Sequence, residues 1–366
     1  MTSTASTTAS ADRRWLILAV LGLAQLMVVL DATIVNIALP SAQEALGFSD
    51  ANRQWIITAY ALSFGSLLLL RQRVPTARPK LDVPGTLTAV GGLLALVYGL
   101  TKAETDGWSA PVTLGLLAAA AVLLTAFALI QRRSNHPLLP PRVVLDRNRG
   151  GAFAAVGLVG AGMFGVFLFL TYYLQQTLGF SPVETGLAFL PMMGALMVTA
   201  TTASAAVLPR VGPRPLVTAG MLLAAGGMVL LTQLGVDSTY AAHVLPGLVV
   251  IGLGLGLAMA TAMGTATLGV RPDDAGVASA SVNTMQQIGG SIGTALLSTL
   301  AASATSSYAA SHATATGAMA QAAVHGYTTA FWWSAAIFAA GAIVSGLLIR
   351  PGTPQVDPAA EPVLAH

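Results

Sequence analysis

Cysteine is absent from the 366-residue chain, and charged residues make up only 8% of it. The first absence excludes disulfide bonds, thiolate metal sites and thiol nucleophiles. Soluble domains carry roughly 25% charged residues, so the second absence excludes a water-soluble protein of this length. The five histidines are scattered and show no metal-ligand spacing, so we predict no metal site.

Apolar residues fill most of the chain, at 55% of the sequence with a mean hydropathy of +0.74. A helix needs about 20 mostly apolar residues to cross a bilayer. We therefore expect an all-α, polytopic transmembrane bundle of about ten spans, with a flexible or weakly helical external loop at 303–327. The predicted spans are 15–39, 55–70, 81–100, 112–130, 151–174, 184–208, 216–234, 243–268, 282–302 and 328–349.

Lysine and arginine are concentrated in alternate loops. With the amino terminus in the cytoplasm, 15 of the 17 basic residues fall on the cytoplasmic side, and only Arg53 and Lys102 fall outside. This asymmetry is what the positive-inside rule predicts. We expect a multi-pass protein of the cell (inner) membrane with both termini cytoplasmic. The net charge of +3 then reflects topology, and no nucleic-acid partner is predicted.

Asp31 is the one acidic residue deep inside a predicted span, whereas the other thirteen acids lie in loops, tails or near span ends. Burial in hydrocarbon costs a charged carboxylate about 2.5–3.5 kcal/mol and favours the protonated form. Such a group can load and release a proton, so Asp31 is our candidate for proton coupling. The alternative is that Asp31 lies near the outer end of its helix, where it meets interfacial water or bonds to Asn36.

Asn283 and Gln287 lie one turn apart in the ninth predicted span. Lipid cannot satisfy amide groups, so these side chains face protein or water. They either line a substrate cavity or bridge neighbouring helices. The nearby GGSIG sequence (289–293) and GLGLG (252–256) follow no strand, so we interpret them as small-residue packing faces and not as phosphate-binding loops.

The fifth and sixth spans supply weaker candidates for substrate binding. Phe167 and Tyr172 belong to an aromatic stripe that suits a lipophilic ligand. Core packing with an interfacial tyrosine belt explains them equally well, above all Tyr172 and Tyr173 near the outer end. Met192 offers an adaptable surface or fills a packing gap, and Pro191 predicts a kink.

Several segments resemble a known transporter family. LDATIVNIALP (30–40) and WIITAYALSFG (55–65) resemble the first two helices of fourteen-helix drug:proton antiporters of the major facilitator superfamily, the EmrB/QacA-like group. LDVPGTLTAVGGLLALVYGLTKAETDGW (81–108) resembles the first of the two extra helices between the six-helix halves of these proteins. The remainder, from HPLLPPRVVLDRNRG (136–150) to Arg350, is similar to their whole second half.

The resemblance implies an incomplete first half. In the family a glycine-rich loop and four further helices follow the second helix, but after Leu70 this chain continues directly into the segment before the first extra helix. Spans three to six are therefore missing at Leu70–Arg71, an even number that preserves sidedness. The implied domains are a cytoplasmic tail (1–14), a two-span remnant of the N-terminal half (15–70), a cytoplasmic linker with two extra helices (71–130), a C-terminal six-helix half (131–350) and a cytoplasmic tail (351–366).

A degenerate copy of the family's glycine-rich loop is LPRVGPRP (208–215). Arg210, Gly212 and Arg214 match the pattern, whereas Pro209 stands where the family has an acid.

The family's activity implies proton-coupled export of lipophilic or cationic drugs, driven by the proton gradient with no bound cofactor. The implied partners are such a substrate and the lipid bilayer. The missing helices favour an alternative, a non-transporting deletion product or membrane scaffold, including self-association through the incomplete half. An integral-membrane enzyme would need acidic or histidine-rich loops, and the cytoplasmic loops contain arginine and proline instead, so we predict no enzymatic activity.

Overall fold

The computed structural model describes residues 82–134, 137–271, 274–313 and 317–353. The chain divides into two compact units, Met1–Arg53 and Gln54–His366, and every described residue belongs to the second. The first two predicted spans, Asp31 and the Leu70–Arg71 junction lie outside the described residues.

The described residues form helices and contain no strand. Eight helical segments are long and apolar enough to cross a membrane, and they correspond to the third to tenth predicted spans. The helices, with π-helical segments written η, are α3 (Val83–Asp106), α4 (Pro111–Arg133), α5 (Pro141–Val144), α6 (Arg147–Tyr172), η1 (Tyr173–Thr177), α7 (Pro182–Ala188), α8 (Leu190–Thr202), η2 (Ala203–Val207), α9 (Leu208–Val211), α10 (Pro213–Leu231), η3 (Tyr240–Val244), α11 (Leu245–Thr267), α12 (Ala275–Ser311) and α13 (Ala318–Leu348).

Local sequence signals account for many helix starts. The Asp82 side chain caps α3 by accepting from the Gly85 amide at 2.9 Å, and Asp146 caps α6 through the Arg149 amide at 3.0 Å. Ser181 and Glu184 form a reciprocal capping box at α7. Proline is favourable in the first turn of a helix, because the backbone N–H groups there make no hydrogen bond within the helix. It occupies one of the first two positions in α3, α4, α5, α7, α8, α9, α10 and α11.

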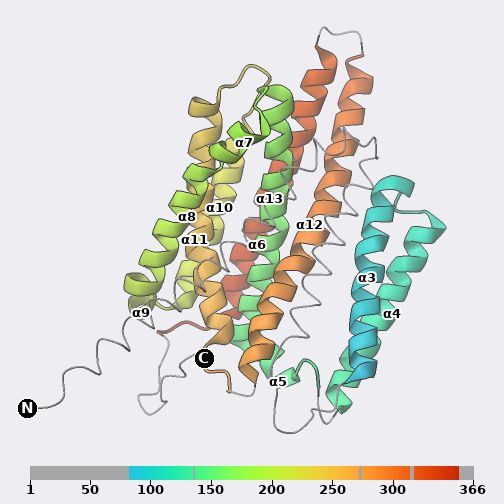
Figure 1. The fold of residues 1–366 in the computed structure, drawn as a ribbon, viewed down its shortest axis with the longest axis vertical. Coiled ribbons are helices and arrows are strands. Elements are labelled where there is room, and N and C mark those ends of the chain that lie inside the picture. Colours follow the sequence, from blue (N-terminus) through green and yellow to red (C-terminus); the bar gives the residue numbers. More distant parts are fainter. Residues whose placement is uncertain (1–81, 135–136, 272–273, 314–316, 354–366) are drawn as a thin grey trace, which may run out of the picture. The chain divides into compact units, whose positions relative to one another are not determined.

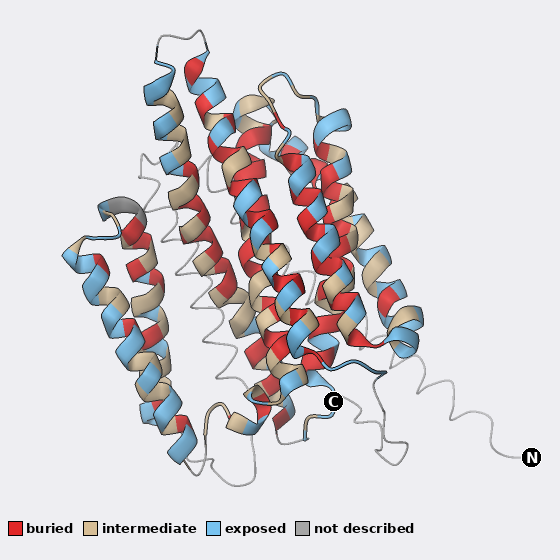
Figure 2. Cartoon of the chain, turned by 180° about the vertical axis from the view of Figure 1, so that it is seen from behind, coloured by how far each residue is buried: buried red, intermediate tan, exposed pale blue. Residues whose placement is uncertain are grey.

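Helix α6 is central to the C-terminal bundle. It packs against α11, α12 and α13, while α10 packs against α11 and α13, and α8 packs against α11. Helices α3 and α4 form an antiparallel pair (Figure 1), and α3 also contacts α12. The buried residues gather where the bundle helices face one another, and α4 is mostly exposed (Figure 2).

Glycines allow these helices to approach with their backbones in contact. A β-carbon on Gly289 of α12 would overlap the carbonyl oxygen of Gly157 on α6. A β-carbon on Gly252 or Gly256 of α11 would overlap the backbone of α8, and one on Gly254 would come within 2.5 Å of the α10 backbone. The GGSIG and GLGLG sequences are therefore packing faces, as predicted.

The prediction of a flexible or weakly helical loop at 303–327 is wrong. Helix α12 has 37 residues and continues to Ser311, and α13 begins at Ala318 after a turn at Gly317, whose φ is +75°. At about 1.5 Å per residue α12 is roughly 55 Å long, well beyond the hydrocarbon thickness of about 30 Å. The segment is rich in alanine and lacks proline, so α12 extends into it from one side and α13 from the other. The two ends form a helical hairpin at the top of Figure 1.

The sixth predicted span is interrupted near Pro191, as expected. Helix α7 ends at Ala188 and α8 begins at Leu190. The hydropathy pattern does not predict the three π-helical segments, although η2 and η3 each end two residues before a proline, Pro209 and Pro246 respectively. Proline lacks the N–H group for a regular hydrogen bond, so a wider turn ahead of it is favoured.

Gly289→Ala is expected to destabilise the bundle, because the new β-carbon would collide with the Gly157 carbonyl oxygen. Overpacking of this kind costs about 1–3 kcal/mol. Gly264→Ala on α11 is the matched control, since its β-carbon would meet nothing within 4 Å. Thermal unfolding of the full chain in detergent should show a lower midpoint for Gly289→Ala only. Equal midpoints for the two variants would contradict the packing role.

Candidate functional site

The two predicted amides lie on one face of α12. Asn283 is exposed, and its Nδ2 atom donates to the Ser279 carbonyl oxygen at a long 3.4 Å. Gln287 follows one turn later and is half-buried. The glycine contacts with α6 fix another face of the same helix. The structure therefore presents an exposed polar face on a rigidly held helix, which suits a ligand that accepts or donates hydrogen bonds.

The aromatic stripe of α6 packs inside the bundle. Phe167 lies 5.1 Å from Phe189, measured between ring centroids, and Tyr172 stacks on Tyr327 at 6.3 Å. Tyr172 is 9% exposed and Tyr173 is fully buried. The expected tyrosine belt is therefore wrong for these two residues, because a belt requires contact with the membrane interface. Their burial comes from contacts with helices that are distant in sequence.

Three tyrosine hydroxyls join helices at one end of the bundle. The Tyr173 hydroxyl donates to the Gly235 carbonyl at 2.8 Å, and the Tyr240 hydroxyl donates to the Ala188 carbonyl at 2.7 Å. The Tyr327 hydroxyl donates to Oε1 of Gln176 at 2.8 Å. The hydrogen bonds of Tyr240 and Tyr327 were not predicted from the sequence. The only sequence signal for them is the position of each tyrosine near the end of a span, where its hydroxyl group can find a polar partner.

Gln175 in η1 carries a buried amide nitrogen. Within the described residues this Nε2 atom has no hydrogen-bond partner. Buried polar atoms are rarely left unpaired, and π-helical turns occur often at functional sites. Gln175 therefore offers a donor to a water molecule or a ligand beside Tyr172, three residues earlier.

Met192 is fully buried in the core of the six-helix bundle. Its backbone carbonyl lies against Gly252 of α11, where a β-carbon would overlap it. Complete burial favours the interpretation of Met192 as a gap-filling side chain. Its role in substrate binding stays a prediction.

Acidic residues avoid the middle of the described helices. Within residues 82–353, excluding the undescribed gaps, every acid lies in a loop or within a turn of a helix end; these acids are Asp82, Glu104, Asp106, Asp146, Glu184, Asp237 and Asp274. The described part of the chain thus offers no proton carrier at membrane depth. Asp31 is outside the described residues, so its place in the fold stays a prediction.

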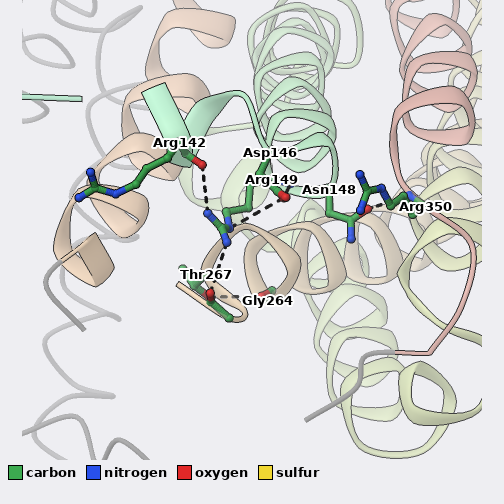
Figure 3. Close-up of polar contacts among 8 residues, drawn as sticks. Arg142, Asp146, Asn148, Arg149, Gly264, Thr267 and Arg350 are labelled. Carbon is green, nitrogen blue, oxygen red and sulfur yellow. Dashed lines mark hydrogen bonds and ion pairs between the residues drawn. The ribbon is translucent and has the colours of Figure 1, made fainter. Parts of the chain in front are cut away.

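A polar network links helix ends at the arginine-rich side that we expect to be cytoplasmic. Arg142 of α5 contacts both carboxylate oxygens of Asp274, which precedes α12, at 2.9 Å each. Arg149 donates to the Arg142 and Gly269 carbonyls at 3.4 and 3.3 Å, and lies beside Asp146 (Figure 3). These contacts connect α5 and the start of α6 with the segment after α11 and the start of α12.

The carboxyl end of α13 belongs to the same network. Arg147 donates to the Leu347 and Leu348 carbonyls at 2.6 and 3.1 Å. Asn148 accepts from the Arg350 amide at 2.8 Å, and Figure 3 shows these two residues side by side. Guanidinium groups are favourable at helix carboxyl ends, where carbonyls lack intrahelical partners. The network therefore holds this end of the bundle as one unit.

Comparison with known proteins identifies transporters. The family model described as the Major Facilitator Superfamily matches residues 83–294. The puromycin resistance protein pur8 of Streptomyces alboniger is 37% identical over 469 aligned positions, which cover 94% of this chain and 93% of that protein. Because this alignment is longer than the 366-residue chain, more than 100 of its positions have no residue here.

Two further relatives are export proteins by name. The cephamycin export protein CmcT of Amycolatopsis lactamdurans is 33% identical over 78% of the chain, and the tetracenomycin C resistance and export protein of Streptomyces glaucescens is 34% identical over 66%. The chain spans only 58% and 45% of the lengths of these two relatives.

Asp274→Asn should remove a pH-dependent part of the stability. Hydrogen bonds from Arg142, followed by the charges of Arg142, Arg271 and Arg149, hold the pKa of Asp274 below its ordinary value of 3.8, against partial desolvation. A lowered carboxyl pKa stabilises the fold above the unfolded value, and this contribution is lost as the pH falls through the folded pKa. At pH 7 we expect a loss of about 1 kcal/mol, since Arg142 is more than half exposed and solvent screens the pair.

Unfolding of the full chain at several pH values checks this prediction. The stability difference between the parent and Asp274→Asn should shrink as the pH falls below the ordinary carboxyl value of 3.8 and through the lower folded pKa. Asp237→Asn, in an exposed loop position, is the control and should follow the parent throughout. A difference that persists unchanged into acid would contradict the ion-pair explanation.

Proposed function

The chain belongs to the Major Facilitator Superfamily, and we propose that it is a proton-driven exporter of lipophilic or cationic small molecules in the cell membrane, with both termini cytoplasmic. The observation that carries the proposal is the 37% identity with a puromycin resistance protein along 94% of this chain. Other relatives are named for resistance to, or export of, further antibiotics. An export role fits a multi-pass membrane protein whose described helices hold no acidic cluster or metal-ligand group.

The substrate site is proposed on the exposed face of α12. Asn283 and Gln287 supply amides there, and the glycine contacts with α6 keep that helix in place. Phe167 and Tyr172 are weaker candidates, because both already pack against aromatic neighbours. Met192 is the weakest, because it is fully buried. Transporters of this superfamily bind substrate near the midplane, at the interface of their two halves.

Proton coupling is assigned to Asp31. The support is an elimination among acids: all those in the described residues lie in loops or near helix ends. A carboxyl group at membrane depth favours its protonated form and can cycle between the two states as its access to water changes. The energy source is then the proton gradient, and no bound cofactor is required.

The finer family is proposed to be the fourteen-helix drug:proton antiporters, with the third to sixth helices missing at Leu70–Arg71. Support comes from the length of the pur8 alignment, in which more than 100 positions have no counterpart in this chain. Four helices of about 20 residues with their loops account for roughly that number.

The same observation favours a second candidate function. Superfamily transporters rock two six-helix halves around a central site, and the predicted first half here has two spans. A chain of this kind would be a non-transporting deletion product, or a membrane scaffold that covers its incomplete half by self-association. Transport and scaffold roles differ in whether Asp31 affects substrate movement.

Asp31→Asn should abolish proton coupling while leaving insertion intact, because asparagine is nearly isosteric and less costly to bury than a carboxylate. The measurement is proton-driven dye efflux in everted vesicles, for the full chain and for an intact relative that carries the same LDATIVNIALP sequence. Asp50→Asn, which lies between the first two predicted spans, is the matched control. Efflux at the parental rate in the Asp31→Asn relative would exclude the coupling role.

A further inference from the structure

Helix α4 packs on α3 with one side and exposes the other (Figure 2). A β-carbon on Gly92 of α3 would come within 2.9 Å of Leu124, whereas one on Gly115 of α4 would meet nothing within 4 Å. Exposed residues recur along α4 at a spacing of three or four, which places them on one face of the helix. We call this face the α4 stripe, and it consists of Gly115, Ala118, Val122, Thr125, Leu129 and Arg132.

Two neighbouring arginines, Arg132 and Arg133, end the α4 stripe, and both are exposed. Within the described residues neither guanidinium group has a hydrogen bond or an ion pair. The carboxylate of Asp82, at the start of α3, is engaged elsewhere, because its two oxygens accept from the Gly85 amide at 2.9 Å and from Nε2 of Gln131 at 2.8 Å. The carboxyl end of a helix carries only about half a negative charge, so the two arginines leave this end of the stripe positive.

We propose that the α4 stripe binds an anionic phospholipid, whose phosphate group contacts Arg132 and Arg133 and whose acyl chains lie along the apolar part of the stripe. Guanidinium groups donate paired hydrogen bonds to phosphate oxygens. Val122 and Leu129, which are 67% and 51% exposed, lie on the same face as Arg132. The rise from Val122 to Arg132 is about 15 Å, half of the roughly 30 Å hydrocarbon thickness. The stripe therefore matches one lipid leaflet from headgroup to chain end.

A second copy of the chain is the alternative occupant of this face. Gly115 and Ala118 are small, and small residues favour helix packing in bilayers. Both copies would insert in the same orientation, because they have the same distribution of basic residues. A two-fold axis along the membrane normal would then bring Arg132 and Arg133 close to the same residues of the other copy. Like charges repel, whereas a phosphate group is complementary to the arginines, so the charge favours lipid.

The arginines determine how strongly the α4 stripe prefers anionic lipid. One basic residue near an anionic membrane surface raises the local concentration of such a lipid about five-fold, equivalent to about 1 kcal/mol. Solvent and salt screen exposed charges. We therefore expect about five-fold enrichment from the pair at low ionic strength and less in high salt. Lipid binding does not require transport, so its test is separate from that of the proposed export function.

Fluorescence quenching in the full chain tests the proposal, since the parent has no cysteine. Ala128→Cys, at an exposed position one turn before Arg132, is labelled with a maleimide fluorophore in nanodiscs that contain equal amounts of phosphatidylglycerol and phosphatidylcholine. Brominated acyl chains are carried first by one lipid and then by the other. Quenching should report about five-fold enrichment of phosphatidylglycerol. Arg132→Gln with Arg133→Gln should abolish the enrichment, and the two lysine substitutions should retain most of it.

Two controls separate this site from a general attraction of the protein for anionic lipid. A fluorophore on Leu114→Cys, about 21 Å away along α4 and thus in the other leaflet, should be quenched equally by the two lipids. Arg210→Gln with Arg214→Gln removes the same charge from another turn and should leave the enrichment at position 128 unchanged. Equal quenching of the parent at position 128 by both lipids, or the same loss in this control, would overturn the proposal. Weak quenching by both lipids, with disulfide-linked dimers of unlabelled Ala128→Cys, would also overturn it and would identify a second copy as the occupant.

Discussion

Backbone contact between helices at glycine positions is the constraint on which the C-terminal bundle depends. A β-carbon at Gly289 would overlap the α6 backbone, and one at Gly252 would overlap that of α8. Lipid is as apolar as the helix surfaces, so association in a bilayer relies on close packing and polar contacts instead of the hydrophobic effect. Through these contacts α6 and α11 hold their neighbours, and the amides of Asn283 and Gln287 on α12 acquire a fixed position. Polar contacts also hold the helices together. Tyrosine hydroxyls make them at one end of the bundle, and the arginine network makes them at the other.

The hydropathy pattern predicted the eight described spans because a membrane helix must satisfy its own backbone over a stretch of fixed length. The hydropathy pattern was misleading at 303–327, where the polar residues indicated a loop. Helix propensity and the absence of proline instead favour extensions of α12 and α13, which the structure contains. At the site, the spacing of Asn283 and Gln287 sufficed to place both on one face. The burial of Tyr172 and the Arg142–Asp274 pair could not be predicted, since both depend on contacts between residues more than 100 positions apart.

The second half of this transporter-family chain is thus well packed, while the predicted first half consists of two spans. A bundle that is held together at both ends can act as one rigid body in a rocking mechanism. Rocking also needs a second body, and the proton-coupling role that we propose for Asp31 needs neighbours that control its access to water. The proposed exporter and the proposed scaffold therefore differ by a single physical requirement, the presence of a complete opposing half.

A comparison of dye efflux tests this requirement most directly. The chain as it stands and a version with four helices inserted at Leu70–Arg71, where we propose that the third to sixth helices of the family are missing, would be produced at matched membrane levels in a host that lacks its own exporters. We predict that the restored version exports and that the present chain exports poorly or not at all, with lower yield and with oligomers in mild detergent. Equal efflux from the two proteins would contradict the requirement for two opposing halves.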